Sequence, residues 1–188
     1  MPNFSDLVEF KVAQNELEIF RRILFSKDIE LHLRREWGSH EPGHREAIRS
    51  HLASEARTSD TYSISHTEGV GGYALLRASD SWQIGLDLEL VHRVSPAVAR
   101  RVSSSPEEFE SSPSSESLWT AKEASYKALK GMNQPAVVSE LNIGSWETYD
   151  SQIETYRLEN LQAFDFTVGY GLVFKKIPFC LSLFVCRP

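Results

Sequence analysis

Three carboxylates and two lysines between residues 87 and 127 have the types and spacing of a phosphate-handling site. Asp87 and Glu89 lie in the segment Gln83 to Val91, whose apolar run and alternation predict a buried strand. Residues two apart on a strand share a face, so the two carboxylates project to the same side, about 6–7 Å apart along the chain. The strand therefore presents an acid pair.

A predicted helix supplies the third acid and the lysines. Apolar residues recur with a helical period from Ser114 to Lys130, and Gly131 ends the pattern. Glu123 and Lys127 then lie one turn apart on one face. Converging carboxylates raise one another's pKa, and a hard cation such as Mg²⁺ removes that cost, while lysines suit phosphate oxygens. Each piece alone is more typical of a charged strand edge or a surface Glu-Lys pair, but the combination indicates metal-dependent phosphate chemistry.

The two segments together resemble the signature of the 4'-phosphopantetheinyl transferase superfamily. The first reads Ile-Gly-Leu-Asp-Leu-Glu, and the second begins 30 residues after Glu89 and reads Trp-Thr-Ala-Lys-Glu-Ala-Ser-Tyr-Lys-Ala. With Glu89 as its second acid, the first motif resembles the surfactin-synthetase-activating type rather than the trimeric holo-acyl-carrier-protein synthase type. Upstream, Ser-Ile-Ser-His-Thr at residues 63–67 resembles the family's Ser-His-Ser motif. The resemblance covers residues 63–130, about a third of the chain.

This resemblance implies an enzyme of the holo-[acyl-carrier-protein] synthase kind. Such an enzyme moves the 4'-phosphopantetheine arm of coenzyme A onto a serine of an apo acyl or peptidyl carrier protein and releases adenosine 3',5'-bisphosphate, as fatty acid, polyketide or nonribosomal peptide biosynthesis requires. By resemblance, Asp87, Glu89 and Glu123 would hold Mg²⁺, with Mn²⁺ as a possible substitute. Glu123, or a water on the metal, would take the serine proton. Lys127 would act in catalysis by neutralising the pyrophosphate.

Further residues are implied in coenzyme A binding. Ser65 and His66 would contact its phosphates, and Lys122 would join Lys127 at the pyrophosphate. Arg45 and Arg49 lie on one face of a helix predicted from His44 to Ala56, in the region that supplies basic contacts to coenzyme A in related transferases. A solvated or structural role suits the same arginines. The Gly-Lys/Arg-Pro element that usually follows this helix is absent, so no residue is assigned to the adenosine phosphates.

Composition and net charge indicate which partners and which cellular location to expect. The formal net charge of -6 argues against a nucleic-acid or membrane partner. No apolar run reaches membrane-spanning length and no export signal is recognised, so the expected location is the cytoplasm. Cys180 and Cys186 would lie roughly 20 Å apart on one strand, which predicts buried, reduced thiols.

The remaining pattern predicts an α+β fold. We expect two similar halves, residues 1–83 and 84–188, that together form one compact enzyme. The resemblance implies that the halves pack as a monomeric pseudo-dimer with the active site between them. His66 is placed in a turn of an antiparallel meander. The expected elements are a strand at Leu7 to Val12, a helix at Asn15 to Phe25, meander strands at Thr61 to Ile64, Gly69 to Leu76 and Trp82 to Val91, and later strands at Leu141 to Trp146, Gln152 to Leu158, Phe164 to Phe174 and Phe179 to Cys186.

Two segments between the motifs are candidates for partner contacts. Residues 103–117 include eight serines, which predicts a mobile connector that could serve as a lid or partner loop. Before it, Ser95 to Val102 predicts a short helix with Pro96 in its first turn. Arg93, Arg100 and Arg101 around this helix either dock an acidic carrier protein or stabilise a solvated helix end.

Two alternative functions remain open. One is a catalytically degenerate module that binds coenzyme A or a carrier protein without chemistry. The other is a metal-dependent phosphoesterase that uses the same three acids.

Overall fold

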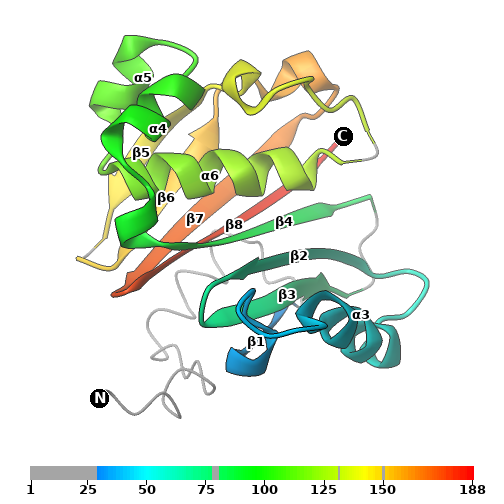
Figure 1. The fold of residues 1–188 in the computed structure, drawn as a ribbon. Helices are drawn as coiled ribbons and strands as arrows, with labels where there is room; N and C mark the ends of the chain where they lie inside the picture. The colour runs from blue at the N-terminus through cyan, green and yellow to red at the C-terminus, as the bar shows by residue number, and fades with distance from the viewer. Residues whose placement is uncertain (1–28, 78–80, 131, 150) are drawn as a thin grey trace.

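A computed structural model describes residues 29–77, 81–130, 132–149 and 151–188. The strand predicted at Leu7 to Val12, the helix predicted at Asn15 to Phe25 and the helix-ending Gly131 lie outside the described residues. The described part is a mixed α/β structure with two antiparallel sheets and four α-helices (Figure 1). No described helix has the length and apolar character to cross a membrane.

The first sheet is small and carries one helix. Its strand order is β1-β3-β2, with β1 at Ile29–Arg34, β2 at Thr61–Thr67 and β3 at Val70–Leu76. Helix α3 (His44–Glu55) covers one face through Ile48 and Leu52, which pack against Trp37, Tyr73 and Leu75. The helix confirms the one expected at His44 to Ala56, whereas strand β1 was not predicted.

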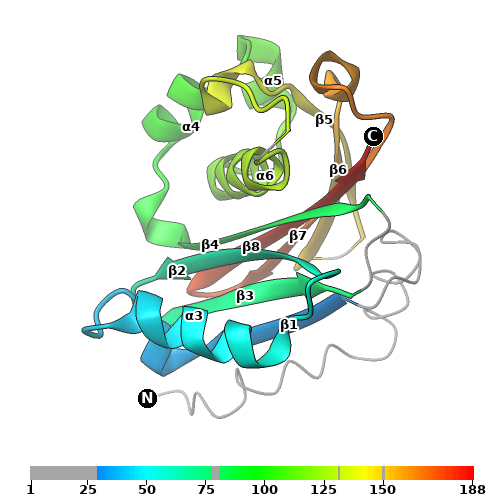
Figure 2. The ribbon, with the colours of Figure 1, turned by 90° about the vertical axis from the view of Figure 1, so that its right-hand side faces the viewer.

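The second sheet has five strands in the order β4-β8-β7-β6-β5. Helix α6 lies over one face, and its long axis is seen end-on in Figure 2, inside the curve of the sheet. The apolar periodicity located all five strands to within a few residues. The bounds are Gln83–Leu90 for β4, Ile143–Thr148 for β5, Ile153–Leu158 for β6, Val168–Lys176 for β7 and Phe179–Arg187 for β8, with helices α4 (Pro96–Val102), α5 (Pro106–Ser111) and α6 (Ser115–Ala128).

The layers follow from where the apolar residues fall. One core lies between the first sheet and α3, a second between the two sheets, and a third between the second sheet and the helices α4 to α6. Alternate residues of β4 serve different layers: Ile84, Leu86 and Leu88 belong to the core between the sheets. Asp87 and Glu89 consequently project from the opposite face of β4, toward α6.

The predicted three-stranded meander is wrong in its last member. Strand β4 pairs with β8, not with β3. On its other side β4 adjoins β2, where the backbone N–H groups of Leu86 and Leu88 donate to the hydroxyl oxygens of Ser63 (2.9 Å) and Ser65 (3.1 Å). Side-chain oxygens thus satisfy this edge of β4 in place of a backbone ladder. His66, expected in a turn, is part of strand β2.

The serine-rich segment is folded rather than a mobile connector. Ser105 caps α5 by accepting from the backbone N–H of Glu108, and Ser114 caps α6 by accepting from that of Ser117. Serine is a preferred N-cap residue, and the composition therefore signals helix starts here. Helix α4 begins as predicted, with Ser95 as its cap and Pro96 in its first turn.

The two cysteines lie on strand β8. Cys180 and Cys186 are buried and not bonded to each other, which confirms the predicted reduced thiols. Burial raises the pKa of the Cys180 thiol to about 12 and also raises the pKa of Cys186. Both side chains therefore act as small apolar groups of the core.

Gly85 sets how closely α6 approaches β4, and its substitution tests that contact. A Cβ at this position would lie 1.8 Å from the carbonyl oxygen of Ala124. We expect Gly85→Ala to force α6 away from β4 and to lower the free energy of unfolding by about 3 kcal/mol, measured by urea denaturation. Gly144→Ala is the control, because its Cβ would meet only the flexible end of Glu159. A Gly85→Ala protein as stable as the control would contradict this packing.

His51 ties α3 to the first sheet and predicts a pH dependence. Arg34 Nη2 donates to His51 Nε2 (2.9 Å), so the ring proton is assigned to Nδ1, which lies 2.8 Å from the Tyr73 hydroxyl. Burial, followed by the nearby Arg34 charge, lowers the pKa of His51 below 6.5. The unfolded chain therefore takes up the proton first, and this stabilisation is complete above pH 6.5 and lost as the pH falls toward the lowered pKa.

We expect His51→Gln to flatten the decline of unfolding free energy between about pH 6.5 and pH 5. The measurement is urea denaturation across that range. The control is His92→Gln, which changes an exposed histidine and should keep the original slope. Identical slopes for the two variants would show that His51 does not titrate in this range.

Candidate functional site

The predicted site residues, apart from Lys122, line a cleft of about 550 Å³ where β2, β4, α3 and α6 come together. All three acids line it, together with Ser65, His66, Arg45 and Lys127. The spacing rules placed the acid pair on one strand face and Glu123 with Lys127 on one helix face, and the structure brings those faces together. The remaining lining residues are Arg49, Tyr62, Ser63, Ile64, Leu88, Trp119 and Lys130.

Asp87 lies at the centre of the polar contacts. Its side chain is buried, and its Oδ1 accepts from Lys127 Nζ at 2.7 Å and from the Ser65 hydroxyl at 3.1 Å. Lys127 Nζ also contacts Ser65 Oγ and the Leu86 carbonyl oxygen, each at 3.2 Å. Asp87 Oδ2 is buried and has no hydrogen-bond partner in the described part of the chain. A buried carboxylate oxygen without a partner is costly and suits a cation.

Glu89 and Glu123 are electrostatically coupled to Asp87. Burial raises the pKa of both carboxyls, and the negative charge of Asp87 raises them further. Trp119 Nε1 donates to Glu89 Oε1 at 3.1 Å, which opposes the rise in the pKa of Glu89. The three acids therefore face a shared cost when they are all ionised, as the sequence predicted.

His66 is held in its neutral form. Arg45 Nε donates to His66 Nε2 at 3.1 Å, which assigns the ring proton to Nδ1. Burial lowers the pKa of His66, and the neighbouring His44 and Arg45 lower it further. Nδ1 is buried and has no partner within the described residues. The ring is thus held neutral, with Nε2 paired to Arg45 and the Nδ1 proton buried.

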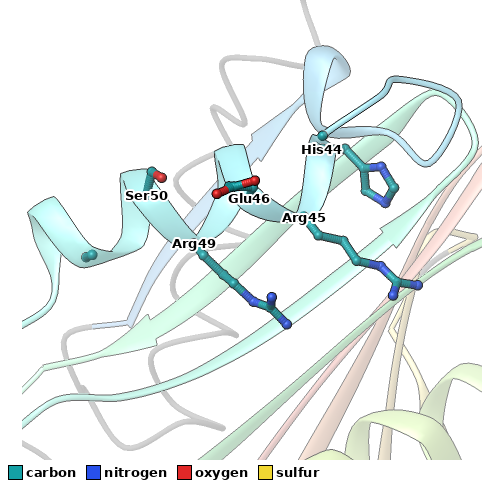
Figure 3. Close-up of a pocket in the computed structure, with 7 residues that line it drawn as sticks. His44, Arg45, Glu46, Arg49 and Ser50 are labelled. Carbon is teal, nitrogen blue, oxygen red and sulfur yellow. The ribbon is translucent and has the colours of Figure 1, made fainter.

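The basic side of the cleft is formed by α3. Arg45 and Arg49 extend from the same side of this helix, as Figure 3 shows. Both also line an adjoining hollow of about 600 Å³ over Gly43 to Ala53. Lys130, in the turn that follows α6, adds a cation that was not predicted from the sequence. The signal was available, because Lys130 lies three residues after Lys127 and so on a neighbouring part of the helix surface.

Lys122 does not reach the cleft, and its expected contact with the pyrophosphate is wrong. Its side chain is fully buried, and Nζ lies 2.9 Å from Glu108 Oε2 and also donates to the Leu141 carbonyl oxygen. Glu108 in turn accepts from the backbone N–H groups of Ser104 and Ile143. Lys122 therefore anchors α6 to α5 and to the start of β5, on a side of the helix other than that of Glu123.

The acids fit a divalent cation without forming a finished site. No three His, Cys, Asp or Glu residues among those the structure describes lie close enough together to hold a metal as they stand. The donor set still suits Mg²⁺, because three carboxylates share the cleft and Asp87 Oδ2 lacks a partner. The fit is one of chemistry, and small side-chain movements would have to complete the coordination.

Comparisons with known proteins include a distant likeness to a solved structure. No protein-family model matches the chain, and a search of curated proteins found no match. Among solved structures, the chain is similar to the crystal structure of Helicobacter pylori holo-[acyl-carrier-protein] synthase in complex with coenzyme A. The match has 20% sequence identity and a TM-score of 0.41, and it covers 55% of this chain and 99% of that chain.

Removal of Lys122 tests the anchor beneath the site. Lys122→Met leaves the Glu108 carboxylate buried without its counterion, and we expect the free energy of unfolding to fall by about 3 kcal/mol in urea denaturation. Adding Glu108→Gln should recover part of that loss, because no unpaired buried charge remains. Lys130→Met, at an exposed position near the end of the same helix, is the control and should change stability by less than about 0.5 kcal/mol.

Proposed function

We propose that this chain is a Mg²⁺-dependent 4'-phosphopantetheinyl transferase of the surfactin-synthetase-activating type. It would transfer the phosphopantetheine arm of coenzyme A to a serine of an apo acyl or peptidyl carrier protein. The observation that carries the proposal is the convergence of three acids with Ser65, His66, Arg45 and Lys127 on one cleft. All of these residues except Arg45, which lies on α3, come from the three separate motifs that resemble the family.

In this proposal the acidic residues bind the metal ion and the basic residues bind the phosphates. Asp87, Glu89 and Glu123 would hold Mg²⁺, which when bound neutralises negative charge on the pyrophosphate. Lys127 and the arginines of α3 would bind phosphate oxygens, because ammonium and guanidinium groups make strong charge-assisted hydrogen bonds to them. His66, held neutral, would orient Arg45 through its Nε2 contact, and a direct bond from its buried Nδ1 to a phosphate oxygen would require the ring to turn.

The reaction requires a base for the carrier serine. As the serine oxygen forms a bond to the β-phosphorus, the bond from that phosphorus to the bridging pyrophosphate oxygen breaks, and adenosine 3',5'-bisphosphate leaves. Glu123 is the candidate to accept the serine proton. Burial raises the pKa of Glu123, which makes its carboxylate a stronger base than that of a solvated glutamate.

The domain arrangement is part of the same proposal. The second sheet begins at Gln83, close to the proposed division into residues 1–83 and 84–188. The cleft lies where the two sheets adjoin, which supports an active site between two halves of a monomeric pseudo-dimer. One sheet has three strands and the other five. The two halves would therefore be alike in their arrangement of a helix on a sheet and not in size.

Helix α4 stays the proposed docking site for the carrier. Arg101 and Arg100 are both exposed, as a charged docking surface requires. The Arg100 guanidinium lies over the Phe109 ring at 4.7 Å, and Arg93 lies 3.7 Å from Glu68. Two of the three arginines therefore have contacts within the chain, and Arg101 is the best placed to meet an acidic partner.

A binding module without catalysis is the second candidate. The observation that favours it is that the three acids do not form a metal-binding group as they stand. Such a module would bind coenzyme A in the cleft and leave the carrier unchanged.

Intact-mass measurement of a carrier protein separates these functions. With coenzyme A and Mg²⁺, the chain should add one phosphopantetheine to an apo acyl or peptidyl carrier protein. Asp87→Asn should slow this transfer by about 1,000-fold, because it removes a charged ligand for the cation. Glu140→Gln, at an exposed position outside the cleft, is the control and should transfer normally. Hydrolysed coenzyme A with an unmodified carrier would indicate a phosphoesterase, and binding without any product would indicate a binding module.

A further inference from the structure

Lys127 forms an ion pair with Asp87, the carboxylate that a bound metal ion would also contact. Its ammonium has three donors, and they meet Asp87 Oδ1, Ser65 Oγ and the Leu86 carbonyl oxygen at 2.7, 3.2 and 3.2 Å. The Asp87 side chain is 5% exposed and that of Lys127 29%. The pair is thus shielded on the Asp87 side and open to the cleft on the lysine side.

We propose that Lys127 is an internal counterion that closes the metal site until an anion in the cleft draws it away. The inference rests on the proposed function and assigns a regulatory role to one of its residues. In the closed state the ammonium offsets the negative charge of Asp87. In the open state a divalent cation takes over that task, and the ammonium pairs with a phosphate of the bound coenzyme.

Electrostatics make the two cations compete. A divalent ion on the free Asp87 Oδ2 would share one carboxylate with an ammonium 2.7 Å from Oδ1. Two positive charges a few ångströms apart at a partly buried site repel each other strongly, because solvent and salt screen them less there than at an exposed surface. The divalent ion therefore binds well only after Lys127 has moved.

The cleft supplies a reason for Lys127 to move. Arg45, Arg49 and Lys130 line the same space, so a phosphate ester is attracted to the place beside Lys127. A lysine has a flexible four-carbon stem, and its ammonium can change partners without movement of the helix. Anion and metal then favour each other's binding, and by linkage the effect is the same in both directions.

Metal titration without any phosphate compound tests the inference. We expect Lys127→Met to bind Mn²⁺ about tenfold more tightly than the unmodified protein, measured by electron paramagnetic resonance of free Mn²⁺. Lys130→Met is the matched control. It removes the same charge from the same cleft but has no contact with Asp87, so it should change the affinity by less than about twofold.

A second measurement uses the unmodified protein. Amine acylation followed by peptide mass spectrometry reports how available each lysine is. Lys127 should be acylated faster when saturating Mn²⁺ is added alone, because the ion displaces its ammonium from Asp87. Lys130 in the same peptide map gives the reference rate and should not change.

The outcomes separate this inference from the proposed function. Equal Mn²⁺ affinities for the unmodified protein and Lys127→Met, or an equal gain in Lys130→Met, would overturn the counterion role even if carrier protein is modified. Tighter binding by Lys127→Met alone would establish the counterion role even if no carrier is modified. Absence of Mn²⁺ binding to every variant, with coenzyme A present, would overturn both.

Discussion

Helix α6 lies directly on the backbone of strand β4 at Gly85, and the geometry of the cleft depends on that approach. Ala124 on the helix occupies the space where a side chain of β4 would otherwise be. The approach brings Lys127 within hydrogen-bonding distance of Asp87 and places Glu123 where the Asp87 charge raises its pKa. A helix held farther away would leave Asp87 without the Lys127 counterion.

The seam between the two sheets serves both structure and site. Ser63 and Ser65 accept hydrogen bonds from the edge of β4, so the two sheets meet through hydroxyl groups. The Ser65 hydroxyl also donates to Asp87 and receives from Lys127. One side chain therefore joins the sheets and orients the central carboxylate. These contacts use the Ser65 donor and both of its lone pairs, so the predicted contact with a coenzyme A phosphate would require one of them to be given up.

Two neighbouring residues of α6 face different surroundings. Glu123 faces the cleft, whereas Lys122 is buried against Glu108 and the Leu141 carbonyl oxygen. Burial lowers the pKa of Lys122, and the Glu108 carboxylate opposes that change. Such a pair adds little net stability over an apolar pair of the same shape, but it fixes the position of the helix because each partner is costly to leave alone. The pair thereby helps to hold α6 at a fixed distance from β4, on which the geometry of the cleft depends.

The sequence by itself determined the local relations. Strand and helix periodicity located β4, α6, α3 and β8, and the two-residue and four-residue spacings placed Asp87 with Glu89 and Glu123 with Lys127. Those relations depend only on backbone geometry within a turn or a pleat, so no distant residue is needed to predict them. The resemblance of the motifs added the expectation that these two faces meet, and the cleft contains both.

The tertiary structure alone decided which partners each element would have. Strand β4 pairs with β8, almost a hundred residues later. The side chains on both faces of β8 are buried, which favours a central position in the sheet, and no local pattern specifies β4 as its neighbour. Lys122 faces inward and the serine-rich segment folds because Glu108 meets Lys122 and Ile143 across the chain. The sequence instead predicted a phosphate contact for Lys122 and a mobile connector for the serine-rich segment, since burial of a charge depends on a partner whose position only long-range packing fixes.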